Sequence, residues 1–554
     1  MDMPKLFKII KNGKNELTKE KVIKDIIAGI IVAIIALPLS VALGISSGVS
    51  PEKGLITAII AGFIVSVLGG SRVQIGGPTG AFVVIIFGII QQYGIEGLII
   101  ATIMAGIILI IFGVCKLGTL IKYISYPITV GFTAGIAITL FSTQVKDFLG
   151  LNMDKVPSEF IPKWSAYIQN MSTTSLVTLV LGLFSLAVII VWPKIDKKIP
   201  GSLIALISAT VIAYVFKLPV ATIGSQFGEI SSKFPTPSIP LVNMDTFIML
   251  LKPAVTIAVL AAIESLLSAV VADGMIGDKH DSNMELIAQG TANIVSGLFG
   301  GIPATGAIAR TAANVKNGGA TPISGMVHAI VLLLIMKIFM PFAKYIPLTT
   351  LAAILVVVSY NMSGWRTFRD LLKAPKSDVI TLIATFTLTV VFDLVVAIEI
   401  GLVISVFLFM RKMAMKLEVN ELKEEQYNNQ KAIIDDINLE VYSDNRVKIY
   451  EIKGALFFGA AEKLMDFIRE VDDSTEIIIL RMHHISNIDV TAYSMIKKVE
   501  EFCKVRKLGL ILSEVQDQPM KVINNMECKE KIGHKDITIE FKEALELAEN
   551  LINV

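Results

Sequence analysis

Long runs of apolar residues recur from Ile23 to Met410, and polar residues interrupt them only briefly. A straight helix needs roughly 20 apolar residues to cross the core of a bilayer. Residues 23–412 therefore predict about 14 membrane helices, several of them short. The first run is too long for a cleavable signal peptide, and similar runs follow it. The expected helices are 23–46, 51–69, 77–91, 95–114, 126–143, 174–192, 201–216, 250–274, 285–299, 303–315, 321–342, 347–361, 379–394 and 396–411.

Composition agrees with a membrane protein and excludes several other classes. The 554 residues are 53% hydrophobic and 18% charged, whereas soluble domains carry about 25% charged residues. A net charge of +2 gives no basis for nucleic-acid binding. Three scattered cysteines form neither a disulfide framework nor a paired metal motif. The five histidines lack the spacing of a zinc hydrolase, and we find no nucleophile–base pair, so an enzyme is not expected.

Basic residues in short loops predict the orientation, because cytoplasmic loops are enriched in lysine and arginine. With an even number of spans, the basic clusters all lie on one side, which places both termini in the cytoplasm. The clusters lie in the N-terminal segment 1–22, at 194–198, at 366–376 and at 411–416.

The pattern changes after Met415. A polar stretch, 413–436, predicts a linker, and from Ile437 short β-rich stretches alternate with helical ones. This alternation predicts a small cytosolic α/β domain over 437–554.

Two membrane segments share a local pattern. Each follows a glycine pair, breaks at a proline (Pro78 or Pro303) and restarts with Thr-Gly-Ala. A proline just ahead of a helical run starts a helix, and matched breaks in two halves of a chain are typical of a transport site. The N-termini of two such helices would attract an anion; ordinary packing kinks are the alternative.

Two charges lie inside expected helices. Arg310, one turn into the second broken helix, could bind an oxyanion or could form a structural ion pair. Glu264 lies in mid-helix and could carry a proton, ligate sodium, or serve as the counter-ion of Arg310.

Other polar residues are expected to be structural. Asp273 is expected near the cytosolic end of its helix, and Asp393 and Glu399 in the turn of a helical hairpin. His328 is expected to be a hydrogen-bonded histidine within the helix bundle, because no metal-ligand spacing surrounds it.

Four stretches resemble the sulfate permease (SulP) family of anion transporters: 36–55, 69–82, 261–274 and 285–315. The C-terminal part resembles the STAS domain. The resemblance implies seven-plus-seven inverted repeats like those of uracil permeases, with a core and a gate subdomain, a pocket between the third and tenth helices, and a homodimer.

The resemblance also assigns residues. Arg310 matches the basic residue of the anion site, and Glu264 matches an acid used for proton or sodium coupling. Ser268 matches a hydroxyl position associated with sodium in a bicarbonate-transporting branch, although that branch has Asp and Thr at the two positions. The residues expected to bind substrate are Gly77, Pro78, Thr79, Gly80, Ala81, Thr305, Gly306, Ala307, Ile308, Ala309 and Arg310.

Two positions differ from the family patterns, one in the first membrane helix and one in the STAS domain. Many family members have a glutamine after the first-helix proline, where this chain has Pro38-Leu39-Ser40, so a polar contact is expected to be lost. In STAS phosphoproteins a serine follows Ile-Asp; here Thr491 could be phosphorylated or could form a local hydrogen bond at the start of a helix.

These observations predict a secondary active transporter of the plasma membrane. It is expected to move sulfate-type anions, bicarbonate or dicarboxylates by alternating access, coupled to protons or alternatively to sodium, without a bound cofactor or metal. A nucleobase permease, a passive anion channel and a sensor remain alternatives, and the STAS domain is expected to have an unidentified cytosolic partner.

Overall fold

The computed structural model describes most of the chain and divides it into two compact units, Met1–Leu402 and Val403–Val554. The described residues are 3–12, 16–119, 125–153, 156–196, 199–238, 240, 243–392, 400–401, 403–408, 410, 418–422, 446–454, 456, 465, 467–526 and 537–552. Asp393, Glu399 and part of the expected span 396–411 (residues 396–399, 402, 409 and 411) lie outside them.

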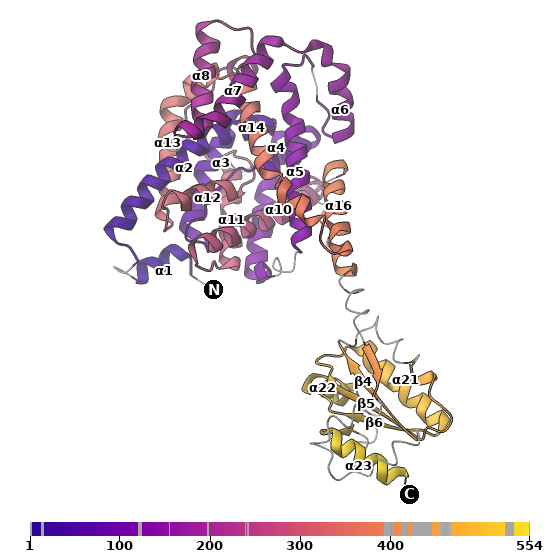
Figure 1. Cartoon of the computed structure of the whole chain (residues 1–554). Coiled ribbons are helices and arrows are strands. Elements are labelled where there is room, and N and C mark those ends of the chain that lie inside the picture. The colour runs from indigo at the N-terminus through magenta and orange to yellow at the C-terminus, as the bar shows by residue number, and fades with distance from the viewer. Residues whose placement is uncertain are drawn as a thin grey trace. The chain divides into compact units, whose positions relative to one another are not determined.

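The first unit is a bundle of helices (Figure 1). Within the described residues, eight helices are long and apolar enough to cross a membrane. The span count of about 14 stays a prediction, since the remaining apolar helices are shorter or more polar. The eight are α2 (Lys19–Ser46), α3 (Pro51–Leu68), α4 (Val83–Val114, counted with the preceding 3-10 turn η2, Gly80–Phe82), α5 (Tyr126–Leu149), α7 (Leu176–Ile195), α10 (Met244–Ile276), α13 (Ile323–Phe339, counted with the following 3-10 turn η5, Met340–Tyr345) and α14 (Leu348–Met362, counted with the following helix α15, Trp365–Leu371).

Shorter helices complete this unit. Gly94, with φ of 70°, separates the two spans predicted within α4, as the apolar pattern indicated. The shorter helices are α1 (Lys5–Asn12), α6 (Phe160–Gln169), α8 (Gly201–Val215), α9 (Ile223–Phe227), α11 (Ser282–Leu298), α12 (Ile308–Lys316), α15 (Trp365–Leu371) and α16 (Lys376–Val391).

Helices α4 and α11 pack so closely that a glycine of each helix lies against the backbone of the other. A Cβ added to Gly106 would lie 2.6 Å from the carbonyl oxygen of Gly290, and one on Gly290 would lie 2.5 Å from that of Gly106. Small residues allow membrane helices to approach at this distance. The contact fixes α11, and with it the chain entering α12, against α4.

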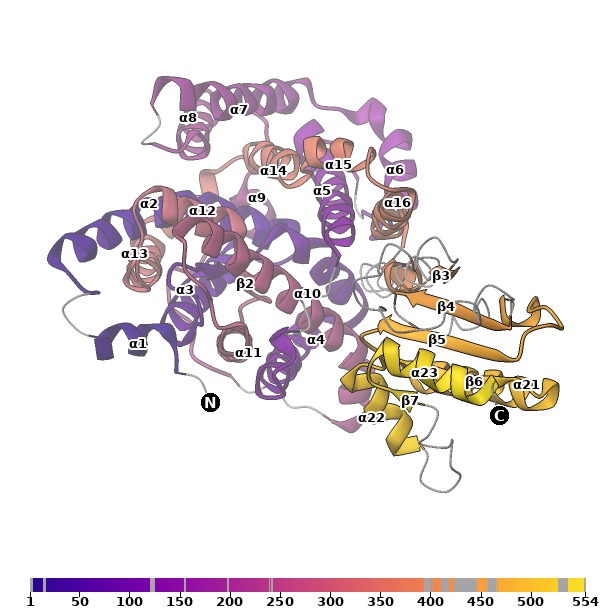
Figure 2. The same ribbon diagram turned by 60° about the horizontal axis from the view of Figure 1, so that its bottom comes forward.

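The second unit is an α/β domain with the strand order β3-β4-β5-β6-β7, in which β3 is antiparallel to β4 and the other pairs are parallel. Alternate residues of the central strands pack on opposite faces: Ile478 and Leu480 against α21 and α22, and Ile477 and Ile479 against α23. Figure 2 shows strands β4 and β5 lying side by side in this sheet. The elements are β3 (Glu418–Glu421), β4 (Val447–Lys453), β5 (Ile477–His484), α21 (Val490–Arg506), β6 (Gly509–Ser513), α22 (Asp517–Met526), β7 (Ile537–Thr538) and α23 (Phe541–Ile552).

One sequence-based expectation is wrong in this region. The polar stretch 413–436 was expected to be only a linker, but its residues Glu418–Glu421 form β3. Val419 of this strand is buried in the core of the domain, and Leu422 directly after it packs against the opposite face of the sheet.

Candidate functional site

The two proline breaks meet inside the first unit. The chain after Val73 forms the short strand β1 (Gly76–Gly77), which pairs antiparallel with β2 (Thr305–Gly306). The register places Gly76 opposite Gly306 and Gly77 opposite Thr305. The segments are therefore in direct contact, although more than two hundred residues separate them in the sequence.

The helices begin later than the prolines suggested. The expected starts at 77 and 303 are wrong, because extended chain continues past both prolines and the α-helices begin at Val83 and Ile308. Pairing between β1 and β2 satisfies backbone groups that would otherwise be exposed within the membrane. Thr79, Gly80 and Ala81 thus form an extended residue and a 3-10 turn rather than an α-helical start.

Part of the expected backbone donor set is already occupied. The N–H of Gly306 donates to the hydroxyl of Ser265 (3.0 Å), and that of Ala307 donates to the carbonyl of Ile75 (2.9 Å). Among the described residues, no acceptor is present for the amides of Gly80, Ala81 and Ile308–Arg310. Amides at the start of a helix lack intrahelical partners and favour negative charge. These N–H groups are the ones that remain for an anion.

Arg310 lies between the two segments. Its Nη2 donates to the carbonyl oxygen of Pro78 (3.2 Å) and to the hydroxyl of Ser40 (3.3 Å). Its Nη1 is buried without a partner among the described residues, and the side chain is 2% exposed. Ser40 thus supplies a polar contact from α2, next to Leu39, where the resemblance predicts that a family glutamine is missing.

No described carboxylate forms an ion pair with Arg310. The alternative in which Glu264 is its direct counter-ion therefore receives no support from this conformation. A buried guanidinium without a carboxylate is costly, and an anion would supply the missing charge.

Gly77 lies against the same guanidinium. It has φ of 158°, and a Cβ added there would collide with Nη1 of Arg310. Glycine therefore allows the backbone of β1 to approach the unpartnered nitrogen.

Glu264 projects from α10 toward the turn before α4. The hydroxyl of Thr79 donates to its Oε2 at 2.8 Å, and the residue is partly exposed. Ser268 instead donates to Thr311 of α12 (3.3 Å). The described structure shows no hydrogen bond between Glu264 and Ser268, so the two residues expected to share a cation have different partners here.

A network of polar side chains holds the extended segments, and the sequence analysis missed most of it. Ser265 Oγ lies 2.7 Å from Thr305 Oγ1, and Gln74 donates to the carbonyl of Ser265 (3.0 Å). Asn293 exchanges two hydrogen bonds with the backbone of Ala304 (both 2.9 Å). Asparagine, glutamine and serine within apolar runs were the available signal, because such residues are buried only when they have partners.

His328 differs from its prediction. It is completely buried, as expected, but neither ring nitrogen has a hydrogen-bond partner among the described residues. The ring packs against Gly62 of α3, where a Cβ would lie 3.2 Å from Cδ2. Asp273, near the end of α10, accepts hydrogen bonds from the backbone N–H (3.0 Å) and ring of His280 (2.7 Å between Nδ1 and Oδ2).

Thr491 is the second residue of α21 and is exposed. The side chain that caps this helix belongs to Asp489, which accepts from the N–H of Ala492 (2.7 Å). The local hydrogen bond expected of Thr491 is absent from the described contacts, because Asp489 occupies the capping position.

The arrangement defines a class of protein: a multi-helix membrane transporter with two interrupted helices that meet at a buried cation, joined to a cytosolic-type α/β module. The sulfate permease family matches residues 22–385, and the STAS domain matches 438–546. The chain belongs to the sulfate permease family.

Relatives and solved structures agree with this assignment. The putative sulfate transporter YvdB of Bacillus subtilis (strain 168) is 41% identical over 517 residues, covering 93% of this chain and 95% of YvdB. The bicarbonate transporter BicA of Picosynechococcus sp. is 31% identical over 437 residues, covering 74% of this chain and 75% of BicA.

Two solved structures are similar in fold. SLC26A9 has a TM-score of 0.86 at 17% identity and covers 99% of this chain and 93% of its own. The transmembrane domain of a cyanobacterial BicA has a TM-score of 0.63 at 30% identity, covering 70% of this chain and 98% of its own. The chain is therefore an anion transporter of this family with a C-terminal STAS domain.

Proposed function

We propose that this protein is a secondary active transporter that carries sulfate-type anions, bicarbonate or a small dicarboxylate by alternating access. The observation that carries the proposal is the unpartnered Nη1 of Arg310 beside the paired strands β1 and β2. Guanidinium and helix N-termini together favour oxyanions. Since Arg310 is 2% exposed, this conformation is closed around it, and binding requires movement of the surrounding helices.

Proton coupling through Glu264 is the second part of the proposal. Its carboxylate lies half-buried in α10 and is hydrogen-bonded to Thr79, which directly precedes the anion-binding turn. Taking up a proton would neutralise one charge near the anion. Sodium coupling is the alternative, supported by the similarity to BicA and weakened by the separate partners of Glu264 and Ser268.

The test is uptake into proteoliposomes with a panel of sulfate, bicarbonate, fumarate and uracil, with and without proton and sodium gradients. We expect uphill accumulation of one anion, stimulated by an inward proton gradient. Uracil uptake alone would identify a nucleobase permease, and currents without accumulation would identify a channel.

Two variants separate the roles. Arg310→Ala should weaken anion affinity by at least tenfold, because the site loses its charge. Glu264→Gln should remove the gradient dependence while leaving exchange of the same anion. Unchanged coupling in Glu264→Gln would exclude this residue as the proton carrier.

The assembly, topology and regulation belong to the same proposal. We expect a homodimer in the plasma membrane with both termini in the cytoplasm, and a STAS domain that binds a cytosolic partner.

Phosphorylation of the exposed Thr491 would place negative charge at the N-terminus of α21, where the helix dipole stabilises that charge.

A further inference from the structure

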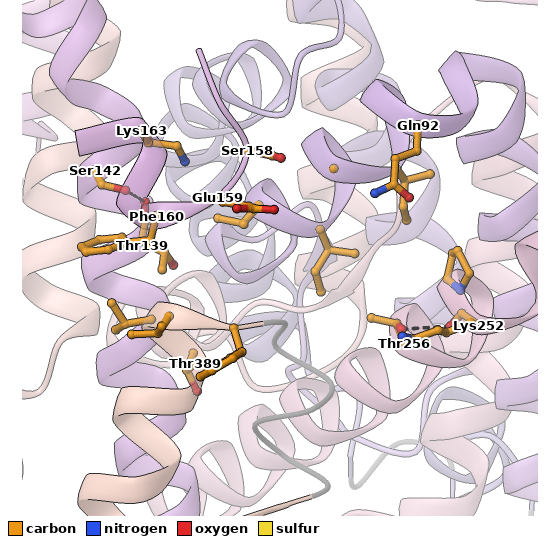
Figure 3. A pocket seen from close by; sticks show the side chains of 18 of the residues that line it. Gln92, Thr139, Ser142, Ser158, Glu159, Phe160, Lys163, Lys252, Thr256 and Thr389 are labelled. Carbon is orange, nitrogen blue, oxygen red and sulfur yellow. Dashed lines mark hydrogen bonds between the residues drawn. The ribbon is translucent and has the colours of Figure 1, made fainter. Parts of the chain in front are cut away.

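A cavity with polar walls and a volume of about 690 Å³ lies in the first unit, and Arg310 is not among the residues that line it (Figure 3). Its described walls come from α4 and α10 on one side and from α5, α6 and α16 on the other. Two lysines line it, together with one carboxylate, an amide and several hydroxyls. These polar residues are Lys163, Lys252, Glu159, Gln92, Thr139, Ser142, Ser158, Thr256 and Thr389.

The cavity lies toward the membrane face opposite the N-terminus. Lys252 is near the start of α10, and the helix continues to Ile276, roughly 36 Å away at 1.5 Å per residue. Just beyond that far end, Asp278 forms an ion pair with Lys5 of α1 (2.9 Å). With the proposed cytoplasmic N-terminus, the cavity opens on the outer side.

Lys163 is the unusual member of this cavity. Its side chain is 2% exposed, and within the described part of the chain it has no hydrogen-bond or ion-pair partner. Glu159, the N-cap residue of α6, does not form an ion pair with it among the described contacts, although Figure 3 shows both side chains at the cavity. A buried ammonium without a counter-ion is unfavourable unless an anion or water occupies the space beside it.

The surroundings do not neutralise this charge. Lys163 also lines a smaller cavity with Lys146 and Asp147 of α5, and these two charges are opposite in sign. Burial lowers the pKa of Lys163 to about 8, so the ammonium form still predominates at pH 7.

We propose that this cavity is an outer access site for the transported anion, in which Lys163 on α6 and Lys252 on α10 attract it from opposite walls before it reaches Arg310. The inference rests on the proposed function, because it assumes that an anion passes between these helices. The ligand class is a small inorganic oxyanion or carboxylate, bound by two ammonium groups and by the hydroxyls around them.

The helices that form the cavity walls also carry residues next to the proposed anion site at Arg310, and this links the two sites. Helix α10 carries Glu264 and Lys252, and the 3-10 turn Gly80–Phe82 joins Thr79 to the start of α4. The opposite wall packs mainly on other helices: α5 lies against α14 and α16, and its contacts with η2 and α4 are fewer. Movement of α4 and α10 against α5 and α6 would change the separation of Lys163 from Lys252, and the access site would be complete only when the outer side is open.

The first experiment measures initial sulfate uptake into proteoliposomes over a range of concentrations. Lys163→Gln should raise KM about 5- to 10-fold with a change in Vmax below about twofold, because an attractive charge is lost along the route. Lys163→Arg should restore KM. Lys233→Gln removes an exposed lysine from the loop before α10 and should leave KM unchanged.

The second experiment does not require transport. Gln92, exposed on the cavity wall, is replaced by cysteine in a chain whose native cysteines are serine. An anionic methanethiosulfonate should label Cys at this position faster than a cationic one does, and Lys163→Gln should reduce that preference at least threefold. Sulfate should slow the anionic reagent, including when Arg310→Gln has abolished uptake.

The outcomes distinguish the two proposals. Loss of charge preference in Lys163→Gln together with protection by sulfate supports the access site, whatever anion is transported. An unchanged preference and an unchanged KM would overturn the access site and leave the role of Arg310 intact. If no anion in the panel is transported but sulfate still protects the cysteine, the proposed function fails and the cavity remains an anion site.

Discussion

The hydroxyl of Thr79 donates a hydrogen bond to the carboxylate of Glu264 at 2.8 Å, and this contact joins the turn before α4 to the middle of α10. One residue lies beside the proposed anion site and the other is the proposed proton carrier. The hydrogen bond thus gives a direct physical route by which the protonation of Glu264 can alter the anion-binding turn.

The Thr79 contact leads to a double-mutant prediction. Thr79→Val removes a hydrogen bond to a charged group, worth about 1.5–3 kcal/mol, and should reduce proton-stimulated uptake several-fold. Thr79→Ser should retain it. In a Glu264→Gln background, Thr79→Val should have little further effect on uptake; additive losses would show that the two residues act separately.

Ser40 should contribute to anion affinity by holding Arg310. Ser40→Ala leaves the guanidinium with only the Pro78 carbonyl among its described partners, so we expect KM to rise about threefold to tenfold. The measurement is concentration-dependent uptake. Ser47→Ala is the matched control, because Ser47 is also buried near the end of α2 but its hydroxyl has no partner among the described residues.

Gly77 should not tolerate a side chain. Gly77→Ala places a methyl group against Nη1 of Arg310 at a φ of 158°, and we expect uptake to fall at least tenfold. Gly274→Ala, in α10, meets nothing within 4 Å and should behave like the wild type. Comparable uptake by both variants would place Arg310 elsewhere during transport.

Outer anion affinity should depend on pH through Lys163. Burial lowers its pKa to about 8, so the attractive ammonium is present below this pH and is lost as the pH rises through it. We expect KM to increase above about pH 8 in the wild type and to vary less in Lys163→Gln. The charged groups nearby are Glu159 at the N-cap of α6, Lys146 and Asp147 on α5, and Lys252 on α10.

The control for this profile is Lys163→Arg, whose guanidinium remains charged across the range. Its KM should stay low up to about pH 9. A rise identical to that of the wild type would assign the pH dependence to another group, such as Glu264.

The apolar pattern by itself indicated the helical membrane part, most of its helix positions and the break near Gly94, because length and hydropathy limit what can cross a bilayer. The repeated Pro-Thr-Gly-Ala and Ile-Pro-Ala-Thr-Gly-Ala stretches indicated two interrupted helices, and Arg310 and Glu264 stood out because charges are rare in such segments.

Only the tertiary structure decided how these residues meet. Residues far apart in sequence meet in the pairing of Gly76 with Gly306 and in the contact between Ser40 and Arg310. The same holds for the separate partners of Glu264 and Ser268. The packing also buries His328 without a partner among the described residues. Local periodicity carries no information about such contacts. Lys163 shows this most clearly: lysine side chains are normally solvated, and only the packing of α6 against α5 and α16 buries this one at a cavity.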